Sequence, residues 1–326
     1  MAELRRDPVS GSWVVVGLTW VKSSQIDVCP FCPGNEHLSG KPIREVNDAG
    51  GAWLVRCFPA ANPIFMIEAS ANKKAEGMYD KMGNVGAHEL VVENRAHTKT
   101  LSDFSEDELA LVLDMHAERI LDLKRDKRFR HVQVYRNHGE LAGSYIYHPH
   151  SHILATSIIP HGTLLEMANS KDHYLQKERC LLCDITAQEI RQNKRVVGLS
   201  ENFVAFCPFA PKFPFEVCLL PRFHSHSFES LIDDRALKYE FIHLFLDVMK
   251  RVERARSSYT IVIHTAPNAV IEDIAQEPAA VENYFHWRVE ILPRDLRSSK
   301  FKREDEFYHA ALTPEETAQI LNADKS

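Results

Sequence analysis

Short apolar runs recur along the chain and predict a series of strands separated by polar turns. The expected strands cover residues 12–16, 53–58, 86–93, 131–137, 147–156, 203–206, 215–220, 260–264 and 286–293. Helical spacing predicts one helix from Ser105, which forms a capping box with Glu108, and a longer helix that carries Phe241 to Val252. Residues 65–86 are polar and predict a loop, whereas residues 157–179 predict a helical, charged connector.

The order of these features repeats once. Each half contains a Cys-x-x-Cys pair, a strand, a proline-containing loop, a strand followed by a histidine, a helix, and two further strands. The last of these strands begins with a histidine, His148 in one half and His286 in the other. This order predicts an internal duplication, with residues 1–172 as the N-terminal half and 173–326 as the C-terminal half.

Composition and charge narrow the class of protein. The chain has 326 residues, 44% of them hydrophobic and 26% charged, and a formal net charge of −6. These values are ordinary for a globular protein and do not suggest nucleic-acid binding. No apolar run has the length of a signal peptide core or a membrane span. We therefore expect a soluble, cytoplasmic protein without nucleic-acid or membrane partners.

Four of the seven cysteines form two Cys-x-x-Cys pairs. One such pair could be a redox dithiol, but two pairs with parallel histidine partners favour metal binding. The first predicted ligand set is Cys29, Cys32, His97 and His148, and the second is Cys180, Cys183, His224 and His286. Two thiolates and two imidazoles close a tetrahedral zinc site, so we expect about two structural zinc ions per chain. Zinc and iron both stay open for the second site.

Three histidines alternate along the expected strand 147–156. If this segment is extended, His148, His150 and His152 project from one face, where they could act as metal ligand, nucleophile or phosphate donor. The alternative is a solvated surface patch that binds metals nonspecifically. Aligning His148 with His286 places Arg288 opposite His150 and Glu290 opposite His152. Only the first half keeps the additional imidazoles, which predicts one active strand per chain.

Several strings of residues resemble the galactose-1-phosphate uridylyltransferases, members of the histidine-triad superfamily. They are Arg6-Asp7-Pro8, Cys29-Pro30-Phe31-Cys32-Pro33-Gly34-Asn35, His88-Glu89, His148-Pro149-His150-Ser151, Phe213-Pro214-Phe215-Glu216-Val217, His264-Thr265-Ala266-Pro267 and His286-Trp287. The resemblance implies an α+β fold with two tandem histidine-triad-like halves. Each half would be a curved antiparallel sheet with flanking helices, and the chain would form a homodimer.

The same resemblance implies roles for individual residues. His150 would attack the α-phosphorus of a nucleotide sugar and form a covalent nucleotidyl-histidine, which a hexose-1-phosphate then accepts. The backbone carbonyl of His148 would orient the ring of His150. Phosphate contacts through side-chain and backbone donors are expected from Asn137, Gly143 and Ser144.

One departure from the family bears on the reaction. The family's transferases carry Gln at the position of His152, whereas the triad hydrolases carry His. An imidazole can protonate a leaving group or assist water, which an amide cannot. The sequence therefore leaves three functions open: a nucleotidyltransferase, a hydrolase or phosphorylase of nucleoside diphosphate sugars or dinucleotides, and a noncatalytic zinc-stapled nucleotide-binding protein. The identities of the base and the sugar also stay open.

Overall fold

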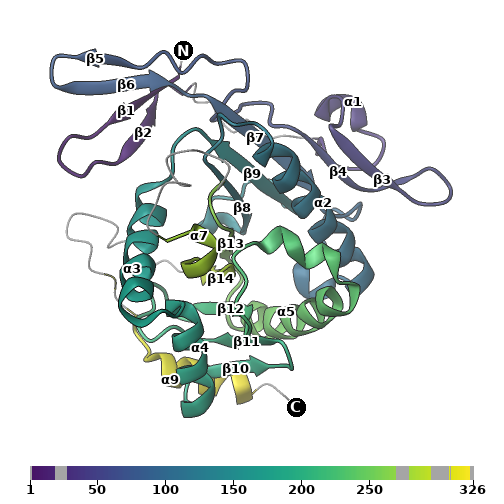
Figure 1. The fold of residues 1–326 in the computed structure, drawn as a ribbon. Helices are drawn as coiled ribbons and strands as arrows, with labels where there is room; N and C mark the ends of the chain where they lie inside the picture. Colours follow the sequence, from purple (N-terminus) through teal and green to yellow (C-terminus); the bar gives the residue numbers. More distant parts are fainter. Residues whose placement is uncertain (1, 19–27, 269–278, 295–307, 309, 324–326) are drawn as a thin grey trace.

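The computed structural model describes the chain except for residues 1, 19–27, 269–278, 295–307, 309 and 324–326 (Figure 1). Its central feature is an antiparallel sheet of ten strands in the described part of the chain. The strand order is β10-β11-β12-β14-β13-β8-β9-β7-β4-β3. The fold is therefore mixed α/β with antiparallel pairing, as expected.

Residues before 157 form one continuous block of this sheet, in the order β3-β4-β7-β9-β8. These strands are β3 (Arg44–Asn47), β4 (Trp53–Pro59), β7 (Gly86–Val92), β8 (His131–His138) and β9 (His150–Thr156). Strand β9 lies between β7 and β8, so the histidine strand has neighbours on both sides. This central position fixes the register of its side chains.

Residues after 195 form the other block, in the order β10-β11-β12-β14-β13. Its strands are β10 (Val196–Leu199), β11 (Phe203–Phe206), β12 (Val217–Pro221), β13 (Tyr259–His264) and β14 (Arg288–Pro293). The two blocks join where β13 pairs with β8. If the strands of each block are numbered 1 to 5 along the chain, both blocks place them in the order 1-2-3-5-4 from the edge of the sheet to its centre. The two blocks therefore share one strand order.

Helices cover both faces of the large sheet. The long helices α2 (Glu106–Lys124) and α5 (Arg235–Ala255) pack on one face and form the main core with residues such as Val134, Ile153 and Ile291. Helices α3 (His161–Lys177) and α4 (Leu181–Gln192) lie on the other side of the molecule (Figure 1). Further short elements are α1 (Glu36–Ser39), α7 (Val281–Tyr284), α9 (Pro314–Ala323), η1 (Leu101–Asp103), η2 (Glu140–Ala142) and η3 (Phe228–Asp233).

A second, four-stranded sheet projects from the large one and has the order β2-β1-β6-β5 (Figure 1). It contains β1 (Glu3–Arg6), β2 (Trp13–Val16), β5 (Lys74–Glu76) and β6 (Tyr79–Gly83). The prediction of a loop over 65–86 is therefore wrong at β5 and β6. All three residues of β5 are exposed, so this strand lacks the apolar alternation that marks a strand in sequence.

Most other predicted elements are confirmed. The Ser105 side chain accepts a hydrogen bond from the backbone N–H of Glu108 and caps α2 as expected. The predicted strands correspond to β2, β4, β7, β8, β9, β11, β12, β13 and β14, although β9, β12 and β14 begin at His150, Val217 and Arg288 rather than at 147, 215 and 286. Within the described ranges, no helix is both long enough and apolar enough to cross a membrane.

Candidate active site and metal centres

The first predicted ligand set comes together at the start of β9. Cys29 and Cys32 lie in the turn after the second strand, His97 follows β7, and His148 precedes β9. One ligand atom from each of the four residues lies within 4.8 Å of all the others. The Cys32 sulfur is 3.3 Å from Nδ1 of His97 and 3.6 Å from Nδ1 of His148. The chain therefore builds this cluster from segments more than a hundred residues apart.

The second predicted set also comes together, at the start of β14. Its members are Cys180, Cys183, His224 and His286, and their ligand atoms again lie within 4.8 Å of one another. The Cys183 sulfur is 3.6 Å from Nδ1 of His224 and 3.4 Å from Nδ1 of His286. Cys180 is the residue immediately before α4, so the Cys-x-x-Cys pair here lies on the first turn of a helix.

Both clusters fit a tetrahedral zinc ion. Bonds of about 2.3 Å to sulfur and about 2.0–2.1 Å to nitrogen at a tetrahedral angle require sulfur and nitrogen to lie about 3.5 Å apart. Nε2 of His148 donates a hydrogen bond to the backbone oxygen of Asn94 at 2.7 Å, and Nε2 of His286 donates to that of Pro221 at 3.1 Å. These bonds leave an Nδ1 lone pair on each ring facing the cysteines, as a metal ligand requires.

His150 is the next side chain along the same face. Its Nδ1 donates a hydrogen bond of 2.7 Å to the backbone oxygen of His148, which is the contact expected from the sequence. Nε2 therefore carries the lone pair; it has no hydrogen-bond partner among the described residues and is not sealed from solvent. Burial lowers the pKa of His150, and its ring packs 5.5 Å from that of Phe31. The site thus presents one neutral, oriented imidazole nitrogen.

His152 lies beside His150, with the two ring centres 5.2 Å apart. Its ring is stacked on Tyr135 of β8 at 4.7 Å, and its Nδ1 lies 3.0 Å from Nε2 of His88 on β7. Burial, together with the neighbouring His150 and His88, lowers the pKa of His152 to about 3. Burial also lowers the pKa of His88 to about 4. Both imidazoles are therefore neutral at pH 7.

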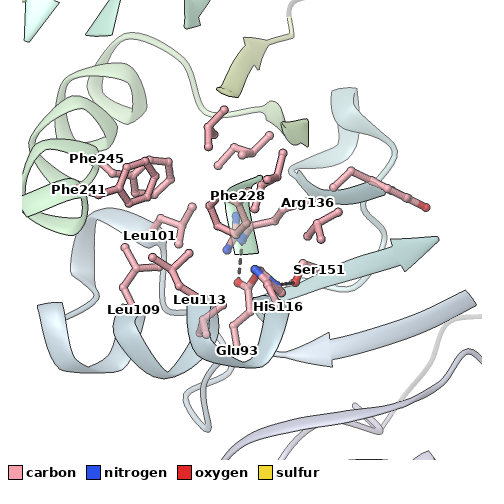
Figure 2. Close-up of a pocket in the computed structure, with 16 residues that line it drawn as sticks. Glu93, Leu101, Leu109, Leu113, His116, Arg136, Ser151, Phe228, Phe241 and Phe245 are labelled. Carbon is pink, nitrogen blue, oxygen red and sulfur yellow. Dashed lines mark hydrogen bonds and ion pairs between the residues drawn. The ribbon is translucent and has the colours of Figure 1, made fainter. Parts of the chain in front are cut away.

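The opposite side of the histidine strand faces the helical core. Ser151 contacts His116 of α2 at 2.7 Å, and Glu93 pairs with Arg136 at 2.8 Å, both without exposure to solvent (Figure 2). These groups line a cavity whose other walls are Tyr135 and apolar side chains of α2, α5, η1, η3 and the sheet. Neither His150 nor His152 lines this cavity. We therefore infer that its residues support strand β9 and do not bind substrate.

The predicted phosphate contacts lie around the turn between β8 and β9. Asn137 is in β8, half-buried, and paired with Thr260 of β13. The backbone N–H groups of Gly143 and Ser144 donate to the carbonyls of Glu140 and Gly139, so the turn itself uses them. The Ser144 hydroxyl donates to the backbone oxygen of Ile146 at 3.1 Å. Of the three residues, Asn137 has the side chain that this turn does not engage.

No role was predicted for several residues that shape the site. Phe31, Tyr135 and His116 pack around the histidine strand, and His88 bonds directly to His152. His88 belongs to one of the strings that carried the resemblance. Strand alternation alone places His88 and Leu90 on one face of β7. Which residues of β9 lie beside them depends on the register of the two strands, which the sequence does not show.

Comparison with known proteins supports a common origin. Residues 19–160 match the family model described as galactose-1-phosphate uridyl transferase, N-terminal domain. An ADP-glucose phosphorylase of Arabidopsis thaliana is 26% identical, with 98% of this chain and 92% of the relative covered. A galactose-1-phosphate uridylyltransferase of Thermotoga maritima is 25% identical, with 93% and 90% covered.

Solved structures agree over nearly the whole chain. A uridylyltransferase structure matches with a TM-score of 0.80 and 25% identity, covering 98% of this chain and 97% of the other. The Arabidopsis thaliana ADP-glucose phosphorylase with bound ADP-glucose matches with a TM-score of 0.76 and 25% identity, covering 100% and 99%. Fold and site thus define an enzyme of the uridylyltransferase and phosphorylase class. Within that class, the chain is similar to the galactose-1-phosphate uridylyltransferases, whose N-terminal domain model its residues 19–160 match.

Proposed function

We propose that the protein is a nucleotidyltransferase that moves a nucleoside monophosphate group from a nucleoside diphosphate sugar to a phosphate-bearing acceptor through His150. The observation that carries the proposal is the hydrogen bond from Nδ1 of His150 to the carbonyl of His148. This bond fixes the tautomer that leaves Nε2 as the nucleophile, and burial keeps the ring neutral.

In the first step the Nε2 lone pair forms a bond to the α-phosphorus, and the bond from phosphorus to the bridging oxygen breaks. The electron pair leaves with the sugar-1-phosphate. The ring keeps its Nδ1 proton and becomes positively charged, and the His148 carbonyl that accepts this proton stabilises that charge. In the second step an acceptor phosphate oxygen attacks phosphorus, the P–N bond breaks, and the electron pair returns to Nε2.

Zinc is the metal we propose for the first cluster, and zinc or iron for the second. Cys29, Cys32, His97 and His148 would hold one ion, and the four residues at the start of β14 would hold the other, where iron stays an alternative. A zinc ion bound by four protein donors supplies a structural cross-link rather than an activated water. The first cluster thereby fixes His148, whose carbonyl orients His150. Metal analysis of the purified protein should find about two ions per chain.

The acceptor distinguishes two versions of this function. A hexose-1-phosphate would make the protein a uridylyltransferase-type enzyme, as the name of the Thermotoga maritima relative states for that protein. Inorganic phosphate would make it a phosphorylase, and the long match to an ADP-glucose phosphorylase favours this second candidate. Both acceptors attack the same histidine-bound intermediate, so the first half-reaction does not separate them.

Initial-rate kinetics with UDP-glucose and ADP-glucose, each with galactose-1-phosphate or inorganic phosphate, test the proposal. Double-displacement kinetics and a new nucleoside diphosphate product are expected with one donor–acceptor pair. Release of nucleoside monophosphate without an acceptor would instead indicate the hydrolase. Binding of nucleotide without turnover of any pair would indicate the noncatalytic protein.

Architecture and location complete the proposal. We propose that the shared strand order of the two sheet blocks reflects two tandem histidine-triad-like halves, divided within α3 between residues 172 and 173. We also propose a cytoplasmic homodimer without nucleic-acid partners. Sedimentation analysis of the purified chain tests the dimer.

A further inference from the structure

The hydrogen bonds of two buried imidazoles fix the position of each proton on their rings. The backbone N–H of Ile64 points at Nδ1 of His88 at 3.3 Å. Because an N–H group can only donate, Nδ1 of His88 accepts and carries no proton. The proton of neutral His88 is therefore on Nε2, the atom that lies 3.0 Å from Nδ1 of His152.

The same reasoning extends one ring further. Nε2–H of His88 donates to Nδ1 of His152, so Nδ1 of His152 is an acceptor and the proton of this ring is on Nε2. Tyr135 stacks on the ring with an interplanar angle of 7° and holds its orientation. Nε2 of His152 has no hydrogen-bond partner among the residues that the structure describes, and it is not buried from solvent. His152 thus offers an N–H donor beside His150.

We propose that His88 is a positioning residue that makes His152 a fixed hydrogen-bond donor to the nucleotidyl phosphate, and so favours transfer over hydrolysis. The inference rests on the proposed function. A phosphate acceptor attacks with an anionic oxygen and needs no base, whereas water must lose a proton as it attacks. With Nδ1 occupied by His88 and Nε2 protonated, His152 has no free lone pair to take that proton.

The surroundings of His152 keep the ring neutral. The titratable groups that face it are His88 from β7, Tyr135 from β8 and His150 from its own strand. Burial lowers the pKa of His88 to about 4 and raises that of Tyr135 to about 12, so neither is charged near pH 7. In the described chain, no carboxylate contacts His152 to favour its charged form. The donor is therefore the same group from pH 6 to pH 8.

Nitrogen-15 NMR of histidine-labelled protein tests the proton positions without any turnover. We expect a protonated Nε2 and an unprotonated Nδ1 on both His88 and His152, with signals assigned by H88L and H152Q. In H88L, His152 should show a mixture of the two tautomers. A proton on Nδ1 of His152 in the unchanged protein would overturn the inference, whatever the activity.

A double-mutant cycle tests the functional consequence. Replacing His88 by Leu should slow nucleotidyl transfer about tenfold while His152 is present, and should raise the ratio of hydrolysis to transfer. In the H152Q background the same replacement should change the rate less than about twofold, because an amide NH₂ donates without tautomer selection. H88Q should restore part of the loss, since its amide can donate to Nδ1 of His152.

The outcomes separate this inference from the proposed function. If H88L slows transfer equally in both backgrounds, His88 only supports the loop at Ile64 and the inference is wrong. If the unchanged protein transfers no nucleotidyl group to any acceptor, the proposed function fails, and the NMR result still decides the proton positions. Circular dichroism of each variant shows whether it has folded.

Discussion

Strands β9 and β14 are built alike and do different things. Each is preceded by a histidine of a Cys/His cluster, His148 or His286, whose Nδ1 faces two cysteines and whose Nε2 donates to a backbone carbonyl. Two residues further on, His150 keeps a free Nε2, whereas Arg288 is paired with both Glu166 and Glu290.

The charges beside the two strands explain the difference in chemistry. Next to β14, one arginine meets two carboxylates, so the group has no excess positive charge to bind a phosphate. Glu290 is also bonded to His264 at 3.1 Å, and although burial opposes its ionisation, His264 and Arg288 hold its pKa well below its usual range. Next to β9, the rings are neutral. The Nε2 lone pair of His150 and the Nε2–H donor of His152 have no partner among the described residues. One scaffold therefore carries the proposed reaction centre at β9 and an ion-pair cluster at β14.

Removing the nucleophile should have the largest effect on activity. We expect H150A to lower kcat at least about a thousandfold, because the proposed covalent step uses Nε2 of His150 as its nucleophile. The thermal unfolding midpoint should change little, since the ring's hydrogen bond is to a carbonyl that the metal cluster already holds. H243A, which removes an exposed imidazole of α5, is the matched control and should keep full activity.

Removing a metal ligand should affect both strands, but in different ways. H148N should lose one metal ion per chain and most activity, because it releases the carbonyl that orients His150. H286N should lose one metal ion and stability while keeping activity per folded molecule. Metal content and kcat of the two variants, measured together, check this contrast; equal losses of kcat would count against it.

Arg288 should matter for stability alone. R288M leaves Glu166 and Glu290 facing each other in a nearly closed space, and we expect a loss of about 3–5 kcal/mol in the free energy of unfolding. The double variant R288M/E166Q should recover part of that loss. Urea denaturation measures both values, and a large drop in kcat for folded R288M would show that β14 takes part in the reaction.

The effect that is smallest near neutral pH concerns His131, the first residue of β8. Both of its ring nitrogens are buried without a hydrogen-bond partner among the described residues, and burial, then His264 and Lys124, lower its pKa to about 3. In the unfolded chain its pKa is about 6.5, so the unfolded state binds the extra proton. Stability should therefore fall by about 1.4 kcal/mol per pH unit on acidification from about pH 6.5 towards 3, from this residue alone. H131F should lower the slope of the unfolding free energy against pH by about 1.4 kcal/mol per pH unit, which corresponds to one proton. Urea denaturation of H131F and of the unchanged chain at several pH values measures this difference.

Much of the site could be predicted because its residue types are distinctive. Cysteine pairs and histidines that repeat in the same order nominate both ligand sets, and the structure brings all eight residues together in two clusters. The apolar residues that end β9 predict a buried strand, in agreement with its position between β7 and β8. These signals are local and need no knowledge of register.

The remainder depends on contacts between distant segments. His88 meets His152 only because β7 pairs with β9 in a register that sets Leu90 opposite His152. Strand β5 is exposed and polar, and β6, which pairs with both β1 and β5, buries only Met82, so neither strand leaves an alternating apolar pattern in the sequence. Strands β3 and β10 are four residues long and lie at the edges of the large sheet, where one side has no partner strand in the described part of the chain.

The central claim is that Nε2 of His150 carries the nucleotidyl group from the nucleotide sugar to the acceptor phosphate. Protein mixed with a nucleotide sugar labelled on the α-phosphate, without acceptor, should gain one nucleoside monophosphate, and peptide mapping should locate it on His150 as an acid-labile, alkali-stable adduct. Addition of the acceptor should discharge the label into a nucleoside diphosphate product. Turnover with no adduct, or an adduct on another residue, would contradict the account.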